Sequence, residues 1–397
     1  MGLIRRLQTA LSKSPRLAIG LISGTSVDGV DAALIEIANH GIETRIRPLH
    51  FITFPYPHDI QKSILKCSVP GQGSVDEICR LNVLVAEVFS QAALSLLREA
   101  NVPIHDVAFI GSHGQTIHHL PEPMAFGDGE IRSTLQIGDP SWIAKRTGIV
   151  TVGDFRPADM ALGGEGAPLV PYFDYITFRH GIKNRAVLNL GGIANFTILK
   201  AGAQIDDVMA FDTGPANMLI DGLMSELYNR PFDDEGAVAR SGIVSKSLLD
   251  FCLEHSYFRK KPPKSTGRED FGETYLQEVL AAASAEDLCH EDIVATATEL
   301  TTFSIWESYR NFVENTVNVD EIIVSGGGLY NKYLVESLTK KFKGASVLPI
   351  DQFDIPGEAK EAICFAVLAN ETMAGNPGNV PSATGASGPT ILGKICL

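Results

Sequence analysis

The stretch that decides the fold is Ala18–Ile37, which reads A-I-G-L-I-S-G-T-S-V-D-G-V-D-A-A-L-I-E-I. The apolar runs Leu17–Ile22 and Ala32–Ile37 predict two strands, and the polar segment Ser23–Gly29 predicts a tight turn between them. Glycines let a ligand approach the backbone closely, and successive backbone N–H groups in such a turn can bind an anion. The segment fits a phosphate-binding hairpin, and it also fits an ordinary polar turn.

The composition indicates a globular enzyme with large cores. The 397 residues, enough for two domains, are 45% hydrophobic and 20% charged, and the mean hydropathy is +0.08. The net charge of −14 and the lack of a long basic run argue against a nucleic-acid partner. No apolar stretch reaches the length of a membrane span, and the six cysteines are scattered. The basic residues 1–17 predict a helical lead-in and lack a secretory core, so we expect a cytoplasmic protein with no membrane partner.

Strand and helix patterns alternate along the rest of the chain. The second half repeats the opening theme, because the apolar run Ala186–Leu190 leads through Gly191 and Gly192 into a second apolar run, Phe196–Leu199. Two such hairpins predict an α/β fold made of a duplicated unit. Gly153–Pro171 is typical of a long functional loop between the halves. Further strands are expected at Leu49–Phe54, Val107–Ile110, Thr134–Ile137, Ile149–Val152, Val208–Phe211 and Glu321–Val324. Helices are expected around 81–96, 217–228, 245–255, 275–285, 293–312 and 358–373.

Asp212 is the strongest catalytic candidate. It follows the predicted strand Val208–Phe211 and precedes a predicted helix, so its carboxylate would lie at the carboxyl edge of a sheet. A carboxylate kept ionised there could accept a proton as a general base, and it could equally cap the helix. Asp212-Thr213-Gly214 matches one aspartic-peptidase triplet, but that chemistry needs two and the sequence has no second one.

Two further segments offer ligand contacts. Lys264–Arg268 could donate to an anion or form a surface loop, and Pro262 with Pro263 before it excludes a Walker loop. Ser325–Gly328 follows an apolar strand, and its glycines could pack against a nucleotide base or simply begin a helix.

His113 and Arg156 are the candidates for a substrate pocket. His113 lies in a polar, glycine-flanked turn, where it could bind a substrate or have a structural role. Arg156 could bind a carboxylate or phosphate with its planar guanidinium, or form a salt bridge with Asp154 or Asp159.

Taken together, these segments resemble the anhydro-N-acetylmuramic acid kinases of the sugar kinase/Hsp70/actin superfamily. The resemblance runs from about Ala18 to Leu392. It is carried, in this order, by I-G-L-I-S-G-T-S-V-D-G-V-D, I-G-S-H-G-Q-T, L-Q-I-G-D, G-D-F-R-P-A-D, G-G-E-G-A-P-L-V-P, N-L-G-G-I-A-N, F-D-T-G-P-A-N-M-L-I-D, P-K-S-T-G-R-E, S-G-G-G and N-V-P-S-A-T-G-A.

The resemblance implies two ribonuclease-H-like domains of the actin-like ATPase type with a central cleft. Residues 1–152 and about 376–397 would form the first, and residues 153–375 the second. ATP would bind with Mg²⁺, and the chain would form a homodimer. The nucleotide would contact Gly24, Thr25, Ser26, Val27, Asp28, Gly29, Val30, Asp31, Gly191, Gly192, Asn195, Gly326, Gly327 and Gly328.

The reaction that the resemblance implies is a double one. Water opens the internal bridge of a 1,6-anhydro sugar at the anomeric carbon, and the freed 6-oxygen takes the γ-phosphoryl group of ATP. Asp212 aligns with the catalytic base, and Glu361 aligns with a second active-site carboxylate. His113, Arg156 and Asp154 fall in motifs near the sugar.

The sequence departs from the family pattern in the Asp-Phe-Arg loop. Pro157 and Ala158 follow Arg156 where the family commonly has arginines, and Glu165 stands where glutamine is usual. Two other functions stay open from the residues alone. One is a kinase of an ordinary hexose or amino sugar, in which Asp212 would deprotonate a sugar hydroxyl. The other is a non-catalytic clamp that closes on ATP around a partner.

Overall fold

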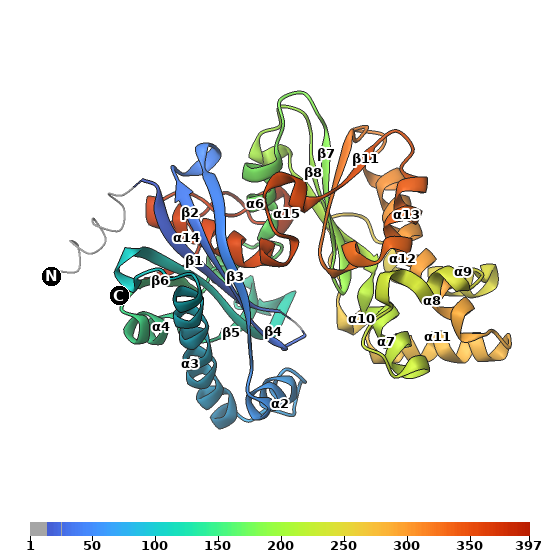
Figure 1. The fold of residues 1–397 in the computed structure, drawn as a ribbon, viewed down its shortest axis with the longest axis horizontal. Coiled ribbons are helices and arrows are strands. Elements are labelled where there is room, and N and C mark those ends of the chain that lie inside the picture. The colour runs from blue at the N-terminus through green and yellow to red at the C-terminus, as the bar shows by residue number, and fades with distance from the viewer. Residues whose placement is uncertain (1–13, 25) are drawn as a thin grey trace. The chain divides into compact units, whose positions relative to one another are not determined.

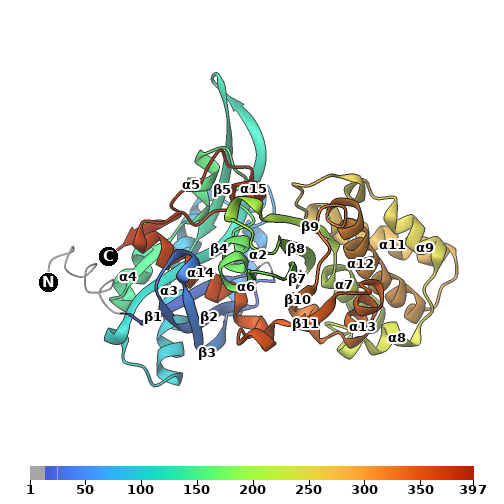
Figure 2. The ribbon, with the colours of Figure 1, turned by 90° about the horizontal axis from the view of Figure 1, so that it is seen from above.

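The computed structural model describes residues 14–24 and 26–397, so the basic lead-in and Thr25 lie outside the described residues. The chain divides into two compact units. Unit 1 comprises the described residues up to Thr177 together with Asp354–Leu397, and unit 2 comprises Phe178–Phe353. Figures 1 and 2 show the elements of both units.

These junctions differ from the domain boundaries predicted at 152/153 and about 375/376. The segment after residue 153 is not a continuous loop, because it contains α5 (Arg156–Ala161) and the start of α6 (Val170–Phe178). Helix α5 contacts strand β5, and α14 (Lys360–Ala374) packs on β1 and β4 of the first sheet. The segment after residue 153 and helix α14 therefore belong to unit 1, because both pack on its sheet.

Unit 1 is built on one sheet, which has seven strands in the described part of the chain and the order β12-β6-β4-β1-β2-β3, with β5 paired to β4. Strands β1, β2 and β3 form an antiparallel meander, and β4 and β6 run parallel to β1. The strands are β1 (Arg16–Ser23), β2 (Gly29–Ala38), β3 (Arg45–Pro55), β4 (Val107–Phe126), β5 (Gly129–Ile137), β6 (Val150–Gly153) and β12 (Lys394–Cys396).

Unit 2 repeats this arrangement in a five-stranded sheet with the order β11-β10-β7-β8-β9. Here β7, β8 and β9 form the meander, and β10 and β11 follow in parallel pairing beside β7. The strands are β7 (Arg185–Leu190), β8 (Ile193–Leu199), β9 (Met209–Pro215), β10 (Glu321–Ser325) and β11 (Ser346–Pro349). An antiparallel meander extended by two parallel strands is the ribonuclease-H-like topology, so the predicted fold class of two such domains is confirmed.

The predicted helices are present, within a few residues of the expected ends. Unit 1 contains α2 (His58–Cys67), α3 (Val75–Glu99), α4 (Pro140–Thr147), α5, nearly all of α6, α14 and α15 (Pro381–Thr384). Unit 2 contains α7 (Asn217–Tyr228), α8 (Ala237–Ser241), α9 (Lys246–Leu253), α10 (Arg268–Phe271), α11 (Glu273–Ala285), α12 (His290–Phe312) and α13 (Lys332–Lys341). A capping box between Ser74 and Glu77 begins α3.

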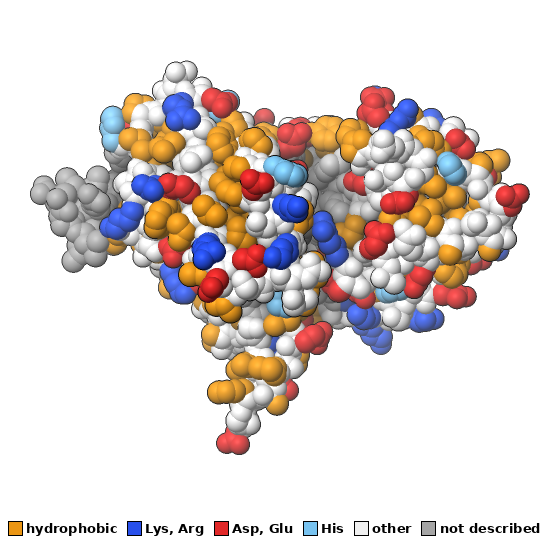
Figure 3. All heavy atoms as spheres, turned by 90° about the horizontal axis from the view of Figure 1, so that it is seen from below, with side chains coloured by type: hydrophobic (Ala, Val, Ile, Leu, Met, Phe, Trp, Pro, Cys, Tyr) orange, Lys and Arg blue, Asp and Glu red, His pale blue; other side chains and the backbone are white. Residues whose placement is uncertain are grey.

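Helix α3 is long and apolar enough to cross a membrane by length and composition, but 61% of its most apolar window is buried inside the protein. Its side chains Val85, Phe89 and Leu96 belong to the core of unit 1, as expected for a core helix. The hairpin of β4 and β5 extends from the sheet (Figure 2), and hydrophobic side chains lie on the surface of this projection (Figure 3). Met124 and Phe126 of the hairpin are exposed.

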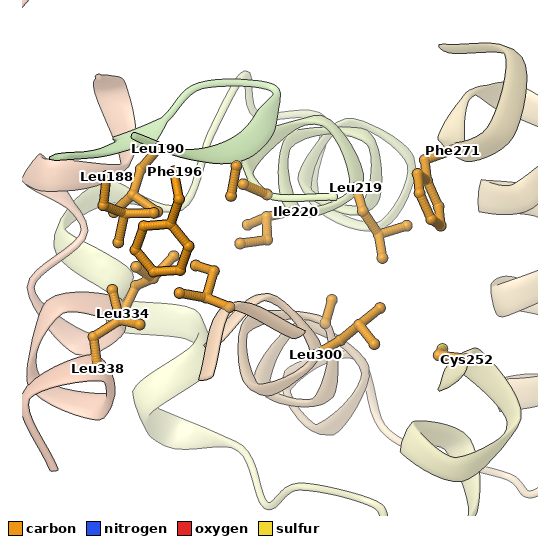
Figure 4. Close-up of a cluster of buried hydrophobic side chains, with 14 of the residues drawn as sticks. Leu188, Leu190, Phe196, Leu219, Ile220, Cys252, Phe271, Leu300, Leu334 and Leu338 are labelled. Atoms are coloured by element: carbon orange, nitrogen blue, oxygen red, sulfur yellow. The ribbon is translucent and has the colours of Figure 1, made fainter. Parts of the chain in front are cut away.

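Each sheet packs on helices through a dry apolar layer. In unit 1, α14 lies so close to the sheet that a Cβ atom at Gly111 would come within 2.0 Å of the Phe365 carbonyl oxygen. In unit 2, Leu188 and Phe196 of the sheet pack near Leu334 of α13, and Leu219 and Leu300 carry the same core into α7 and α12 (Figure 4). Burying one such side chain contributes roughly 1.5–3 kcal/mol, so these layers hold the strand ends in place.

Candidate active site

The turn between β1 and β2 has a shape that its surroundings enforce. Val27 adopts a left-handed backbone with φ 55°, and its N–H donates to the Gly24 carbonyl at 3.3 Å. That conformation costs a β-branched residue about 1–3 kcal/mol, and here the buried Val27 side chain anchors it in the core. Gln115 of β4 accepts a hydrogen bond from the Ser23 hydroxyl at 2.5 Å, which fixes the start of the turn. Contacts within unit 1 thus hold the described residues on both sides of Thr25, and phosphate binding by this turn stays a prediction.

Carboxylates gather behind this turn. Asp31 accepts a hydrogen bond from Thr53 Oγ1 at 2.6 Å, yet burial raises the pKa of Asp31 to about 6, and repulsion from Asp28, Glu361 and Glu358 adds to the rise. Glu361, near the start of α14, is accessible to solvent, but the density of protein around it raises its pKa, while Lys360 and Arg156 oppose that rise. Unit 1 therefore brings the predicted residues Asp31 and Glu361 together in an acidic setting.

The buried His113 and the half-buried Arg156 form one hydrogen-bonded pair. The Nδ1 atom of His113 lies 3.0 Å from the Gly114 carbonyl, and its Nε2 atom lies 3.0 Å from Arg156 Nε and 2.9 Å from Nη2. Because a carbonyl only accepts and a guanidinium only donates, His113 must be the neutral tautomer protonated at Nδ1. Burial and the Arg156 charge both hold its pKa well below the usual range. His113 thus orients Arg156, whose Nη1 atom also donates to the Gly166 carbonyl at 2.7 Å.

The two aspartates beside Arg156 have other partners. The Asp154 carboxylate forms an ion pair with Lys394 of β12. Asp159 is fully buried and accepts hydrogen bonds from the Gly166 N–H at 2.9 Å, from Asn379 Nδ2 at 2.8 Å and from Thr384 Oγ1 at 2.8 Å. Asp159 therefore ties the G-G-E-G and N-V-P-S-A-T-G motifs together, a role that the sequence analysis did not predict.

Asp212 lies in the middle of β9, beside Asn195 of β8 in the strand register. The strand is longer than predicted, and α7 starts at Asn217 with Ala216 at its N-cap, so Asp212 does not cap the helix. The carboxylate of Asp212 accepts a hydrogen bond from the Thr266 N–H at 2.9 Å. Of the two roles open from the sequence, the general base fits this half-buried, oriented carboxylate.

The Lys264–Arg268 segment runs alongside Asp212 and is not simply a surface loop. The Asp212 N–H donates to the Lys264 carbonyl at 3.0 Å, and Lys264 is only 8% exposed. The hydroxyl of Tyr257 donates to the Asp212 carbonyl at 2.8 Å. The sequence analysis named the cationic segment but missed this contact, because the two segments are joined only by the tertiary fold.

The glycine turns of unit 2 lie together. The N–H groups of Asn217 and Met218, at the start of α7, donate to the carbonyls of Gly191 and Gly192, each at 3.1 Å. Gly326 has φ 84°, and a Cβ atom there would lie 2.7 Å from the Leu190 carbonyl oxygen, so a side chain would not fit. The 191–192 and 326–328 turns thus form one close-packed backbone surface within unit 2, and nucleotide binding there stays a prediction.

Comparison with known proteins places the chain in a family. The profile of the family described as anhydro-N-acetylmuramic acid kinase matches residues 16–397. The anhydro-N-acetylmuramic acid kinase of Caldanaerobacter subterraneus subsp. tengcongensis is 44% identical over 394 residues, covering 99% of this chain and 100% of that protein. The kinase of the same name from Salinibacter ruber is 47% identical over 385 residues, covering 97% of each.

Among solved structures, component A of (R)-2-hydroxyglutaryl-CoA dehydratase from Acidaminococcus fermentans matches at a TM-score of 0.46 with 11% identity. The match covers 90% of this chain and 99% of that one. Because this TM-score is low, the fold assignment is based on the strand topology and not on this match. The family profile and the two relatives span nearly the whole chain, and the chain belongs to the anhydro-N-acetylmuramic acid kinase family.

Proposed function

We propose that this chain uses ATP and water to convert anhydro-N-acetylmuramic acid into N-acetylmuramic acid 6-phosphate and ADP, as a step in cell-wall recycling. The oxygen of water bonds to the anomeric carbon while the bond from that carbon to O6 breaks. O6 then bonds to the γ-phosphorus as ADP leaves, and the proton lost by water goes to a base. The family supports the substrate, and the Asp212 carboxylate held by the Thr266 N–H is the observation that carries the mechanism.

Asp212 is the base in this proposal. The Thr266 N–H donates to its carboxylate and fixes the direction of that group, and an ionised carboxylate can accept the proton of the attacking water. The leaving oxygen is captured by phosphorus, so the reaction does not demand the second carboxyl group that ordinary glycosidases use as a general acid.

ATP would place its phosphates at the 24–31 turn of unit 1, with the glycine turns of unit 2 also binding the nucleotide. Mg²⁺ suits the carboxylates of Asp31 and Glu361, because burial raises the pKa of both groups and a bound cation would favour their ionised forms. The ion usually takes one or two carboxylates together with phosphate oxygens and water. When bound, it would neutralise charge on the phosphates.

The sugar would be recognised by Arg156, oriented by His113. A guanidinium has five N–H bonds. Arg156 uses some of them in its contacts with His113 and Gly166, and the others would donate to the lactyl carboxylate of the substrate. Sugar binding by Asp154 stays a prediction, since its carboxylate pairs with Lys394. We also propose a cytoplasmic homodimer, and light scattering on the purified chain tests the dimer.

The test compares Asp212→Asn with the wild type and with Asp206→Asn, an exposed carboxylate nearby in the chain. Asp212→Asn should abolish ADP release with anhydro-N-acetylmuramic acid while nucleotide still binds, and Asp206→Asn should behave as the wild type. In ¹⁸O-labelled water, rapidly quenched product should carry the label at the anomeric carbon. Unlabelled product would indicate an ordinary sugar kinase, and wild-type turnover by Asp212→Asn would remove Asp212 from its role.

A further inference from the structure

The amine of Lys264 is buried in an unusual setting. The side chain is 8% exposed, and its Nζ atom has no hydrogen-bond partner among the described residues. The Nζ atom lies 4.6 Å from the centre of the Tyr257 ring and 5.4 Å from that of Phe312. Ring faces attract a cation, but burying a charge without hydrogen bonds remains costly. The free-energy cost of burying this charge therefore indicates that the ammonium group of Lys264 interacts with another charged group.

Asp212 is the neighbour whose negative charge can offset the buried positive charge of Lys264. The Lys264 carbonyl binds the Asp212 N–H, and two residues later the Thr266 N–H binds the Asp212 carboxylate. Burial lowers the pKa of Lys264 to about 8, and the negative charge of Asp212 opposes that decrease. The two side chains are thus close enough to interact electrostatically, in addition to the backbone contacts between their segments.

We propose that Lys264 is a positioning residue whose buried ammonium group keeps the Asp212 carboxylate ionised, while the Thr266 N–H fixes its direction. This inference rests on the proposed function, in which Asp212 is the base. The rings of Tyr257 and Phe312 enclose the amine, so Lys264 acts through Asp212 and does not contact the substrate.

The other charged groups around this site do not replace Lys264. Lys260 also lies over the Tyr257 ring, at 5.5 Å, but it is exposed to solvent, which screens its charge. Burial raises the pKa of Tyr257, so its hydroxyl stays neutral. From α10, Asp270 accepts a hydrogen bond from Thr266 Oγ1 at 2.7 Å, and Glu269 is a second acid. Both acids would disfavour ionisation of Asp212, and the buried ammonium group of Lys264 opposes them. Arg268, at the start of α10, is a further cation of this segment, and it is exposed to solvent.

The test is the pH dependence of kcat/KM for the anhydro sugar at saturating MgATP, measured for Lys264→Met and for the matched control Lys260→Met. A nearby cation favours the ionised carboxylate, so its removal should move the acid limb of the profile to higher pH by about one unit. Activity on the acid side should then fall about tenfold, with little change on the alkaline side. Lys260→Met should follow the wild type.

Unfolding separates this role from a structural one. Methionine keeps the length of the side chain and removes a buried amine without hydrogen bonds, so Lys264→Met should melt at or above the wild-type temperature. Lys264→Arg keeps the charge and should restore the acid limb. A profile of Lys264→Met that superimposes on the wild type, or a uniform loss at every pH together with a lower melting temperature, overturns the inference.

The Asp212→Asn variant separates the two proposals. If Asp212→Asn is inactive and Lys264→Met has a wild-type profile, the inference about Lys264 fails alone. If Asp212→Asn turns over normally, the proposed base fails, and the Lys264 inference fails with it.

Discussion

Removing the buried carboxylate of Asp159 should destabilise unit 1 far more than removing an exposed one. Asp159 is fully buried and accepts hydrogen bonds from Gly166, Asn379 and Thr384. In Asp159→Ala these three donors lose their acceptor in a place that water does not reach. The segments that they join lie far apart in the sequence, so the variant also frees the loop that carries Gly166 to move away from Arg156.

The size of the effect follows from the three contacts. A buried donor left without a partner costs about 1–3 kcal/mol. Asn379 Nδ2 keeps a second acceptor in the Gly388 carbonyl at 3.2 Å, and the Thr384 hydroxyl can rotate, so these two donors lose less than the Gly166 N–H. We expect a loss of about 3 kcal/mol for Asp159→Ala, and about 1–2 kcal/mol for Asp159→Asn, which keeps the volume and one acceptor oxygen. Against a typical domain stability of about 5–15 kcal/mol, this is a large fraction.

The chain offers a specific probe for the assay. It has two tryptophans, Trp142 in α4 of unit 1 and Trp306 in α12 of unit 2. In a Trp306→Phe background, fluorescence during urea unfolding reports on unit 1 alone. The control is Asp154→Asn, which removes the charge of an ion pair with the exposed Lys394 and still suits the left-handed backbone at residue 154, where φ is 59°. It should cost less than about 1 kcal/mol. The reasoning is refuted if Asp159→Ala costs no more than Asp154→Asn.

Two further predictions concern charged groups of unit 1. Arg156→Ala should raise KM for an anhydro sugar that bears the lactyl group more than for one that lacks it, because the guanidinium N–H bonds would bind the lactyl carboxylate. Steady-state kinetics with both sugars tests this prediction. Equal increases in KM would show that the lactyl carboxylate binds elsewhere. Lys360→Met should cost about 3–5 kcal/mol in urea unfolding, because it leaves the buried carboxylate of Asp174 without its cation. The double variant with Asp174→Leu should recover most of that loss, and a double variant as unstable as the single one would contradict the argument.

The parts of the fold that could be predicted from the sequence are those with strong local patterns. The meander strands are apolar runs around glycine turns, and helices such as α7 bury one face at regular spacing. Strands β11 and β12 were missed because they are short and only partly buried, so no apolar run marks them. The family and its kinase activity were predicted correctly because many motifs occur in one order.

The site could be predicted only in part. Asp212 is singled out by the sequence because it follows the apolar run Val208–Phe211, and that signal is local. The burial of Lys264 has no such signal, since two prolines and four polar neighbours surround it in the sequence. The pairing of His113 with Arg156 likewise joins residues on separate elements, β4 and α5. Such contacts join residues that are far apart in the sequence. They form only when the sheets assemble, so no local sequence pattern predicts them.

The two units balance their charges differently, and this difference suits the proposed reaction. In unit 2, the Asp212 carboxylate has its own compensation, from the Thr266 N–H and the charge of Lys264. In unit 1, burial raises the pKa of the half-buried Asp31, and repulsion from Asp28, Glu361 and Glu358 adds to the rise. A cation that arrives with the nucleotide would favour the ionised form of Asp31. The proposed base therefore has a compensating charge within its own unit, whereas the carboxylates near the proposed phosphate turn would gain one from the magnesium-bound nucleotide.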